Sequence, residues 1–94
     1  MNVYLVVRND STDYDEFDSF VCVAKSAKSA REMHPYGNAF DCPIFWNGKE
    51  WRYGKKGGLA LSSSWTYPEN TTTQLIGVAK SKTPWVVCAS FNAG

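Results

Sequence analysis

The sequence predicts a small α+β domain, with a mostly antiparallel sheet of about five or six strands and one short helix on a face. Three observations support this prediction. Runs rich in β-branched and aromatic residues alternate with turn-forming segments. Only residues 26–33 have the composition of a helix. The chain has 94 residues, which favours a single domain over residues 1–94.

The first two strands are expected over residues 2–8 and 19–25. Residues 2–8 (NVYLVVR) are apolar with little alternation, a pattern typical of a central strand covered on both faces. Residues 19–25 (SFVCVAK) place Cys22 on one face, with valines on the other. The polar and acidic residues 9–18 between the two strands predict a loop.

The helix is expected from Ser26 to Met33. Ser26 is suited to the N-cap position, and the alanines and arginine that follow favour helix. His34 and Pro35 end the segment. Since the helix has only about two turns, packing on the sheet must stabilise it.

A β-hairpin is expected over residues 44–53 (IFWNGKEWRY). Asn47-Gly48 between two aromatic-rich runs favours a two-residue type I′ turn. Such a turn places Ile44 opposite Trp51. One face then carries Ile44, Trp46, Trp51 and Tyr53, and the other carries Phe45, Glu50 and Arg52.

The remaining segments follow from the same signals. Residues 54–64 are Gly- and Ser-rich and predict a flexible connection. Residues 65–70 are turn-like around a proline. Strands are expected over residues 71–79 and 85–91, with a polar turn between them.

Composition narrows the function classes. Ten basic and nine acidic residues give a net charge of +1, which argues against a general nucleic-acid binder. The three cysteines, an odd number without a CxxC motif, are interpreted as reduced thiols. Cys22 and Cys88 are expected to be buried in strands. Because no signal peptide or membrane-length apolar run is visible, a cytoplasmic location is expected.

The acidic segment is the first candidate site. Five of the nine acidic residues lie within residues 10–18, interleaved with Tyr14 and Phe17. The segment lacks the glycine and the ligand spacing of a calcium loop, so no metal site is predicted. It is either a solvated turn or an anionic patch that meets a basic partner surface.

The aromatic hairpin is the second candidate. Its rings either pack in the core or provide an anchor for a partner protein or a stacking platform for a base. Both hairpin faces carry aromatic residues, and at most one can face the core, which favours binding. The partner-binding residues predicted from both segments are Asp13, Tyr14, Asp15, Glu16, Phe17, Trp46 and Trp51.

Basic residues near three glycines form a third candidate. The segment YGKKGG lacks the Walker pattern and is either a mobile connection or a phosphate contact. The ligand-binding residues of this alternative are Arg52, Tyr53, Lys55 and Lys56.

His34 is the only histidine. It could act as a base, or as a metal ligand with Cys42, but no further ligands lie at suitable spacing. Its simpler role is to end the helix. No catalytic motif is recognised, and the protein is expected not to be an enzyme and to need no cofactor.

Residues 14–24 (YDEFDSFVCVA), followed by a helix ending at His34-Pro35, resemble a group of small bacteriophage and prophage proteins. Residues 75–79 (LIGVA) and 86–94 (VVCASFNAG) are similar to the C-terminus of the same group. The resemblance covers both ends of the chain and not the hairpin. It implies a phage origin and a role in the cytoplasm of an infected bacterium, and it assigns no catalytic or binding residue.

These observations lead to two functional hypotheses. The first is a non-enzymatic binding protein that inhibits or modulates a host protein, for example an anti-phage defence protein, by direct contact. The alternative is a sponge that sequesters a phosphate-bearing nucleotide signal, with aromatic rings stacking the base. A homo-oligomer would favour the sponge, since small domains form deep pockets most easily at subunit interfaces. A small enzyme and a structural virion protein are weaker alternatives, and no membrane partner is expected.

Overall fold

The structure is a computed structural model that describes residues 1–12, 15–36, 44–54 and 65–92. It confirms the predicted α+β class, with a mostly antiparallel arrangement of strands and one short helix. In chain order the elements are β1 (Asn2–Arg8), β2 (Glu16–Ala24), α1 (Ala27–Arg31), β3 (Ile44–Trp46), β4 (Trp51–Tyr53), the 3₁₀ turn η1 (Pro68–Asn70), β5 (Thr71–Val78) and β6 (Trp85–Asn92).

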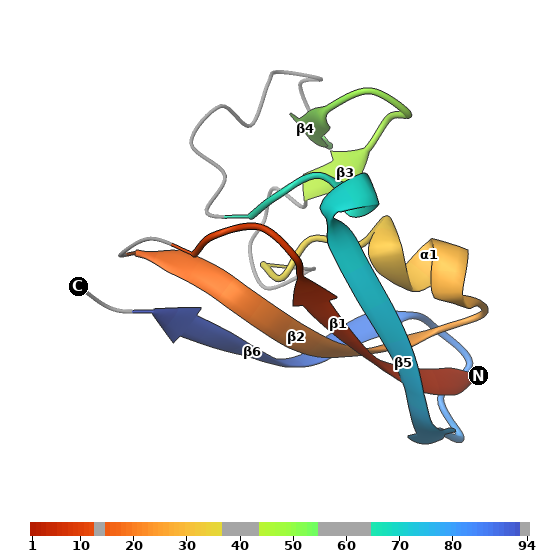
Figure 1. The fold of residues 1–94 in the computed structure, drawn as a ribbon. Coiled ribbons are helices and arrows are strands. Elements are labelled where there is room, and N and C mark those ends of the chain that lie inside the picture. The colour runs from red at the N-terminus through yellow and green to blue at the C-terminus, as the bar shows by residue number, and fades with distance from the viewer. Residues whose placement is uncertain (13–14, 37–43, 55–64, 93–94) are drawn as a thin grey trace.

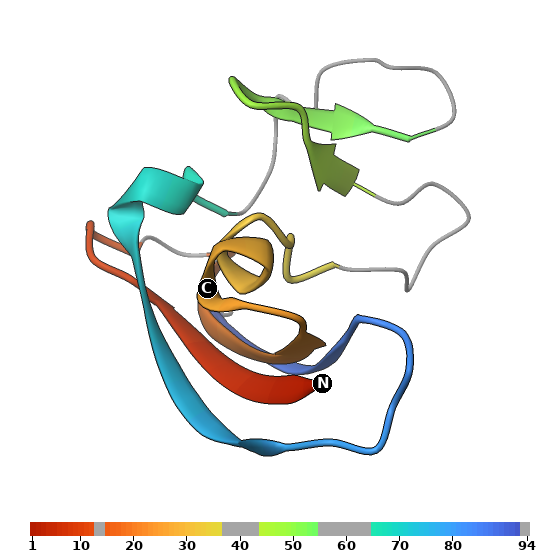
Figure 2. The same cartoon turned by 90° about the vertical axis from the view of Figure 1, so that its right-hand side faces the viewer.

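Four strands form the main sheet in the order β5-β1-β2-β6, and every pair is antiparallel. The central position predicted for residues 2–8 is therefore confirmed. β5 and β6 lie at opposite borders, so the connection between them passes around one end of the sheet (Figures 1 and 2). The N–H of Ala79 in this connection donates to the carbonyl of Met1 at 2.8 Å, which holds the connection against the start of β1.

The core lies on one face of this sheet. Tyr4, Val6 and Phe20 from the central strands pack with Ala30 of α1 and Trp51 of β4. The small hairpin β3–β4 sits above α1, on the same side (Figure 1). The core is therefore packed between the main sheet on one side and the helix and hairpin on the other.

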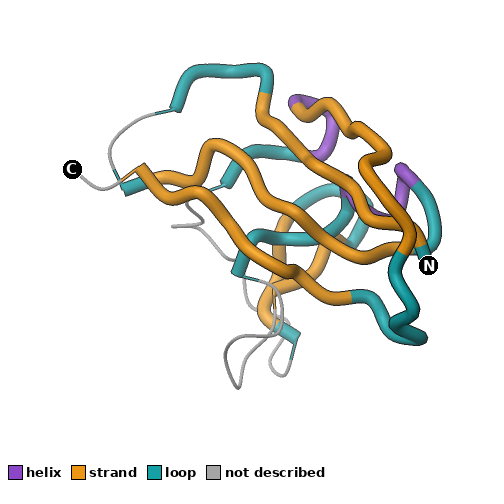
Figure 3. Tube along the Cα trace, turned by 90° about the horizontal axis from the view of Figure 1, so that it is seen from below, coloured by secondary structure: helices purple, strands orange, loops and turns teal. Residues whose placement is uncertain are grey.

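The other face of the sheet, called the outer face here, has no described element over it (Figures 2 and 3). It includes Val7, which is exposed. The prediction that residues 2–8 are covered on both faces is therefore wrong for the described part of the chain. An apolar run without alternation is typical of a doubly covered strand, but valine is also favoured on strands that are half exposed. The pattern alone therefore does not distinguish the two cases.

β2 begins at Glu16, three residues earlier than predicted. A register shift between Phe17 and Ser19 accounts for the extension. It lets Phe17 and Phe20, which would otherwise face opposite sides, both join the core. A bulge of this kind is not visible in a periodic pattern, and the acidic residues around Phe17 resemble a loop.

The helix begins as predicted. The Ser26 hydroxyl oxygen accepts a hydrogen bond from the Ser29 N–H at 3.2 Å, as an N-cap should. The helix ends at Arg31, before the predicted Met33, because Met33 forms an antiparallel bridge with Phe45 of β3. Tertiary pairing with the hairpin thus shortens the helix.

The cysteines divide between core and surface. Cys22 is fully buried, as predicted, whereas Cys88 is exposed on β6, so the prediction of its burial is wrong. Cys88 faces Val21 across the strand pair. β6 is apolar in sequence but lies at the border of the sheet, where burial is incomplete. Cys42 lies outside the described residues.

Candidate interaction surface

The β3–β4 hairpin has a longer turn than the sequence predicts. Trp46 pairs with Trp51, so residues 47–50 form a four-residue connection instead of the predicted two-residue turn. The side-chain oxygen Oδ1 of Asn47 accepts hydrogen bonds from the backbone N–H groups of Lys49 and Glu50, both at 2.9 Å. The predicted pairing of Ile44 with Trp51 is therefore wrong, because the Asn47 side chain stabilises the wider turn.

The predicted faces of the hairpin nevertheless hold. The observed register differs from the predicted one by two residues, and an even shift leaves every side chain on its original face. Ile44 and Trp46 pack against the core, while Phe45 on the opposite face is 45% exposed. Phe45 lies opposite Arg52, whose guanidinium group pairs with the Glu50 carboxylate at 2.5 Å.

Trp51 fixes the hairpin to the body of the protein. Its side chain is 3% exposed, and its indole N–H donates to the Thr66 carbonyl at 2.9 Å. Its ring contacts Trp46 and His34, with centroid separations of 5.1 Å in both cases. Trp51, a predicted partner contact, is thus a core residue in this structure.

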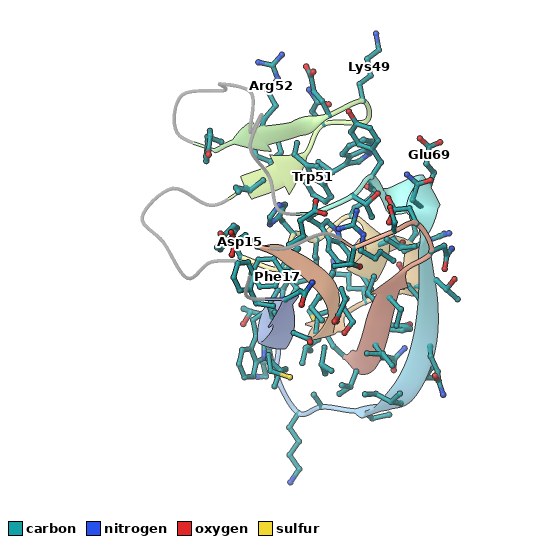
Figure 4. The ribbon with its side chains drawn as sticks, turned by 60° about the vertical axis from the view of Figure 1, so that its left-hand side comes forward. Asp15, Phe17, Lys49, Trp51, Arg52 and Glu69 are labelled. Carbon is teal, nitrogen blue, oxygen red and sulfur yellow. The ribbon has the colours of Figure 1, made fainter. Side chains whose placement is uncertain are left out.

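Exposed aromatic side chains surround this anchor. Tyr67, which is 50% exposed, lies beside Trp46 with ring centroids 5.7 Å apart. Tyr53 and Phe45 are also exposed. These side chains lie on both faces of the hairpin and beside it, and together they form what we call the hairpin surface: Phe45, Trp46, Lys49, Arg52, Tyr53 and Tyr67. Figure 4 shows Lys49 and Arg52 pointing away from the body of the protein, with Trp51 beneath them.

The acidic segment is drawn partly into the fold. Asp13 and Tyr14 lie outside the described residues. Asp15 is exposed in a left-handed backbone conformation with φ of 62°, and its N–H donates to the Asn92 carbonyl at 2.6 Å. Phe17 is 8% exposed and packs edge-on against other rings, so its side chain is part of the core. Figure 4 shows Asp15 just before the start of β2, close to Phe17.

Arg8 organises this region, and the sequence analysis did not single it out. Its guanidinium forms a two-pronged ion pair with Asp10, at 2.5 and 3.1 Å, and lies 3.6 Å from Glu16. It also donates to the Phe17 carbonyl and lies over the Trp65 ring. Alternation along β1 places Arg8 on the same face as Tyr4 and Val6, which is the signal that could have identified it.

Asp10 links Arg8 to η1. Its carboxylate accepts a hydrogen bond from the Thr66 hydroxyl at 2.6 Å, and that hydroxyl oxygen accepts one from the Asn70 side chain. The hydrogen bonds from Arg8 lower the pKa of Asp10, and the hydrogen bond from the Thr66 hydroxyl lowers it further by a smaller amount. Asp10 thus has a structural role in this network.

Two reactive groups are held in the core in their neutral forms. Burial lowers the pKa of His34 to about 4 and raises that of Cys22 to about 11. The His34 ring stacks on Tyr36 at 5.4 Å and its Nδ1 accepts the Tyr36 backbone N–H. Its Nε2 has no hydrogen-bond partner among the described residues. His34 therefore acts here as an aromatic packing residue as well as marking the end of the helical segment.

The predicted phosphate contacts are only partly placed. Arg52 and Tyr53 lie next to each other on β4, whereas Lys55 and Lys56 lie outside the described residues. Within the described ranges, no group of three or more His, Cys, Asp or Glu side chains could hold a metal ion. Over the same ranges, no helix is long and apolar enough to cross a membrane.

Comparison with known proteins gives no further assignment. No family model, curated protein or solved structure matches the chain. The functional interpretation therefore depends on the chemistry of the described surfaces.

Proposed function

We propose that the protein is a non-enzymatic binding protein that inhibits or modulates a host protein by direct contact through the hairpin surface. The observation that supports this most is the arrangement around Trp51. One buried ring holds the hairpin from below, while Phe45, Tyr53 and Tyr67 remain exposed above or beside it. Exposed aromatics on an anchored support bind with little loss of side-chain entropy, as at protein interfaces.

The charges on this surface indicate the chemistry of the partner. Lys49 is exposed, and the Arg52–Glu50 pair lies next to Phe45 on the same face. A partner with an apolar pocket bordered by carboxylates would accommodate Phe45 and approach the cations. A phage origin of the chain is part of this proposal, and with it the partner is a bacterial protein.

The acidic segment has a different place in this proposal from the one expected at first. Asp15 remains a candidate contact because it is exposed, whereas Phe17 and Trp51 contribute by fixing neighbouring groups. Glu16 lies 3.6 Å from Arg8, within the network that holds the start of β2. The hairpin surface is accordingly the primary site and Asp15 a secondary one.

The test begins with affinity capture of a partner from a lysate of a candidate bacterial host, followed by calorimetry with the purified partner. We expect the double variant Phe45→Ala/Tyr53→Ala to weaken binding by about 100-fold, since two interface aromatics are lost. A matched control, Leu75→Ala, removes an exposed apolar side chain from β5 and should leave the affinity unchanged. Equal losses in the two variants, or no loss in the double variant, would contradict the proposal.

The alternative, sequestration of a phosphate-bearing nucleotide, depends on Arg52 and Tyr53, which are neighbours on β4 and point to opposite faces of the hairpin. In this alternative the ring stacks a base and the guanidinium contacts phosphate. Two N–H groups of the Arg52 guanidinium already donate to the Glu50 carboxylate. The guanidinium therefore has fewer donors for a phosphate, which favours protein binding over nucleotide binding. Native mass spectrometry with cyclic and linear nucleotides distinguishes the two, because a sponge retains a small added mass without any protein partner.

A further inference from the structure

Lysine side chains gather at one end of the main sheet. Lys25 follows the last residue of β2, and Lys80 and Lys82 lie in the connection between β5 and β6. Antiparallel pairing brings these segments together, because the end of β2 and the end of β5 both pair with Asn2 at the start of β1. Figures 1 and 2 show the connection beside the N-terminus. The name basic end is used here for four residues: Lys25, Lys80, Lys82 and Trp85.

The positive charge of the basic end is not neutralised locally. Its three lysines are exposed and have no ion pair among the described residues. Asp10, Asp15 and Glu16 lie at the opposite end of the strands, separated by the length of β1, about 20 Å. This separation is about two Debye lengths at physiological salt, so the acidic end is screened from the basic end. The net charge of +1, which argues against a general nucleic-acid binder, is an average over both ends.

Hydrogen bonds hold the connection that carries two of these lysines. The Ser81 hydroxyl donates to the Thr83 carbonyl at 2.8 Å and accepts the Thr83 N–H at 3.3 Å. The bond from the Ala79 N–H to the Met1 carbonyl fixes the start of the connection. The two lysines are therefore kept close together without a ligand. Like charges at this spacing repel each other, and a bound anion relieves the repulsion.

Trp85 adds an accessible aromatic ring to these charges. It is 45% exposed and pairs with Val23 on β2, two residues before Lys25. The next residue, Val86, packs against the core, so alternation places Trp85 on the outer face, which has no described element over it. An exposed ring beside lysines is the combination with which proteins bind single-stranded nucleic acid, since the ring stacks on a base and the ammonium groups contact phosphates.

We propose that the basic end binds a short single strand of nucleic acid, with one base stacked on Trp85 and the phosphates on either side bound by the lysines. This goes beyond the proposed host-binding function and uses a surface apart from the hairpin. A duplex keeps its bases stacked inside the helix, so the Trp85 ring selects an unpaired strand. All three cations are lysines, which bind phosphates as point charges, whereas paired recognition of protein carboxylates favours arginine.

Fluorescence anisotropy with the full chain and a labelled oligothymidine of about ten nucleotides tests the proposal. Between about 50 and 200 mM salt, the logarithm of the binding constant should fall with the logarithm of salt concentration at a slope of about −2, because three phosphate contacts contribute roughly −0.7 each. Lys82→Ala should weaken binding about fivefold and reduce the slope by about 0.7. The matched control Lys49→Ala removes an exposed lysine from the hairpin surface and should change neither quantity. A slope near zero, or equal losses in the two variants, overturns the proposal.

Variants of Trp85 test the stacking contact in the same assay. Trp85→Ala should weaken binding about tenfold and leave the salt slope unchanged, because the ring contacts a base and not a phosphate. Trp85→Phe keeps a stacking ring and should recover most of the affinity, and circular dichroism confirms that both variants are folded. Polyglutamate and phosphatidylserine vesicles serve as the competing anions. Binding of either one as tight as that of oligothymidine, with no effect of Trp85→Ala, would assign the basic end to an acidic protein or a lipid surface and overturn the proposal.

Discussion

At the residue scale, His34 couples stability to pH. Its pKa is near 6.5 in an unfolded chain and about 4 in the fold, so the unfolded state binds more protons between these values. The contribution of neutral His34 to stability is complete above pH 6.5 and is lost as pH falls toward 4. The loss amounts to roughly 3 kcal/mol over this window. Urea unfolding at a series of pH values measures it.

The variant His34→Phe isolates this effect. Phenylalanine keeps the aromatic contacts with Tyr36 and Trp51 but cannot accept a proton. We expect the slope of unfolding free energy between pH 6.5 and 4 to flatten in the variant, after an initial loss of about 1 kcal/mol from the Nδ1 hydrogen bond. An unchanged slope would assign the pH dependence to other groups.

The Arg8–Asp10 pair gives a second residue-scale prediction. The Arg8 side chain is mostly buried, so Asp10→Asn removes its two-pronged carboxylate partner and leaves its charge with the Glu16, Phe17 and Trp65 contacts. We expect a loss of about 1–3 kcal/mol in unfolding free energy. Glu50→Gln breaks the more exposed pair with Arg52 and should cost at most about 1 kcal/mol. Thermal unfolding of both variants gives the comparison, and equal losses would contradict a special role for Arg8.

The sequence could have placed Arg8 on the inner face of β1, but it could not show the partners of Arg8 or of His34, for the same reason. Each depends on partners supplied by distant segments: Thr66 and Trp65 near Arg8, and Trp51 against His34. The sequence places Arg8 at the end of a strand and His34 at the end of a helix. It does not show which segments will surround them, because those contacts form only when the hairpin and η1 pack on the sheet.

At the element scale, the hairpin turn depends on Asn47. Its side chain accepts two backbone N–H groups, so Asn47→Ala leaves both to solvent and removes the preference for the four-residue turn. We expect a loss of about 1 kcal/mol and faster amide exchange at Glu50. Hydrogen exchange measured by NMR checks this locally, with the Val6 amide in β1 as an internal reference. Protection of Glu50 equal to that in the wild type would contradict the prediction.

The hairpin also shows what periodicity can and cannot specify. The alternation of residues 44–53 correctly predicts which side chains share a face. It does not determine loop length, because two-residue and four-residue turns place the same residues on the same faces. The extension of β2 to Glu16 and the early end of α1 are similar cases, in which a bulge and a bridge to Phe45 decide the boundary.

At the scale of the whole molecule, composition and strand patterns were sufficient to predict an antiparallel α+β domain. They did not determine which strands would be borders or which face of the sheet would lack a cover. Strand order arises from long-range pairing, and the apolar segment 85–92 has the composition of a buried strand. Trp85 and Cys88 are exposed on this border strand, whereas Val86 between them packs against the core.

The proposed function leads to a prediction for the whole molecule. The hairpin lies above α1, whereas β6 borders the main sheet below it (Figure 1). We expect partner binding to slow amide exchange at Arg52 on β4 and to leave exchange at Cys88 on β6 unchanged, because the complex covers the hairpin surface. Hydrogen exchange followed by NMR with and without the partner measures both amides. Slower exchange on β6 together with unchanged exchange on β4 would place the contact on β6 and contradict the proposed site.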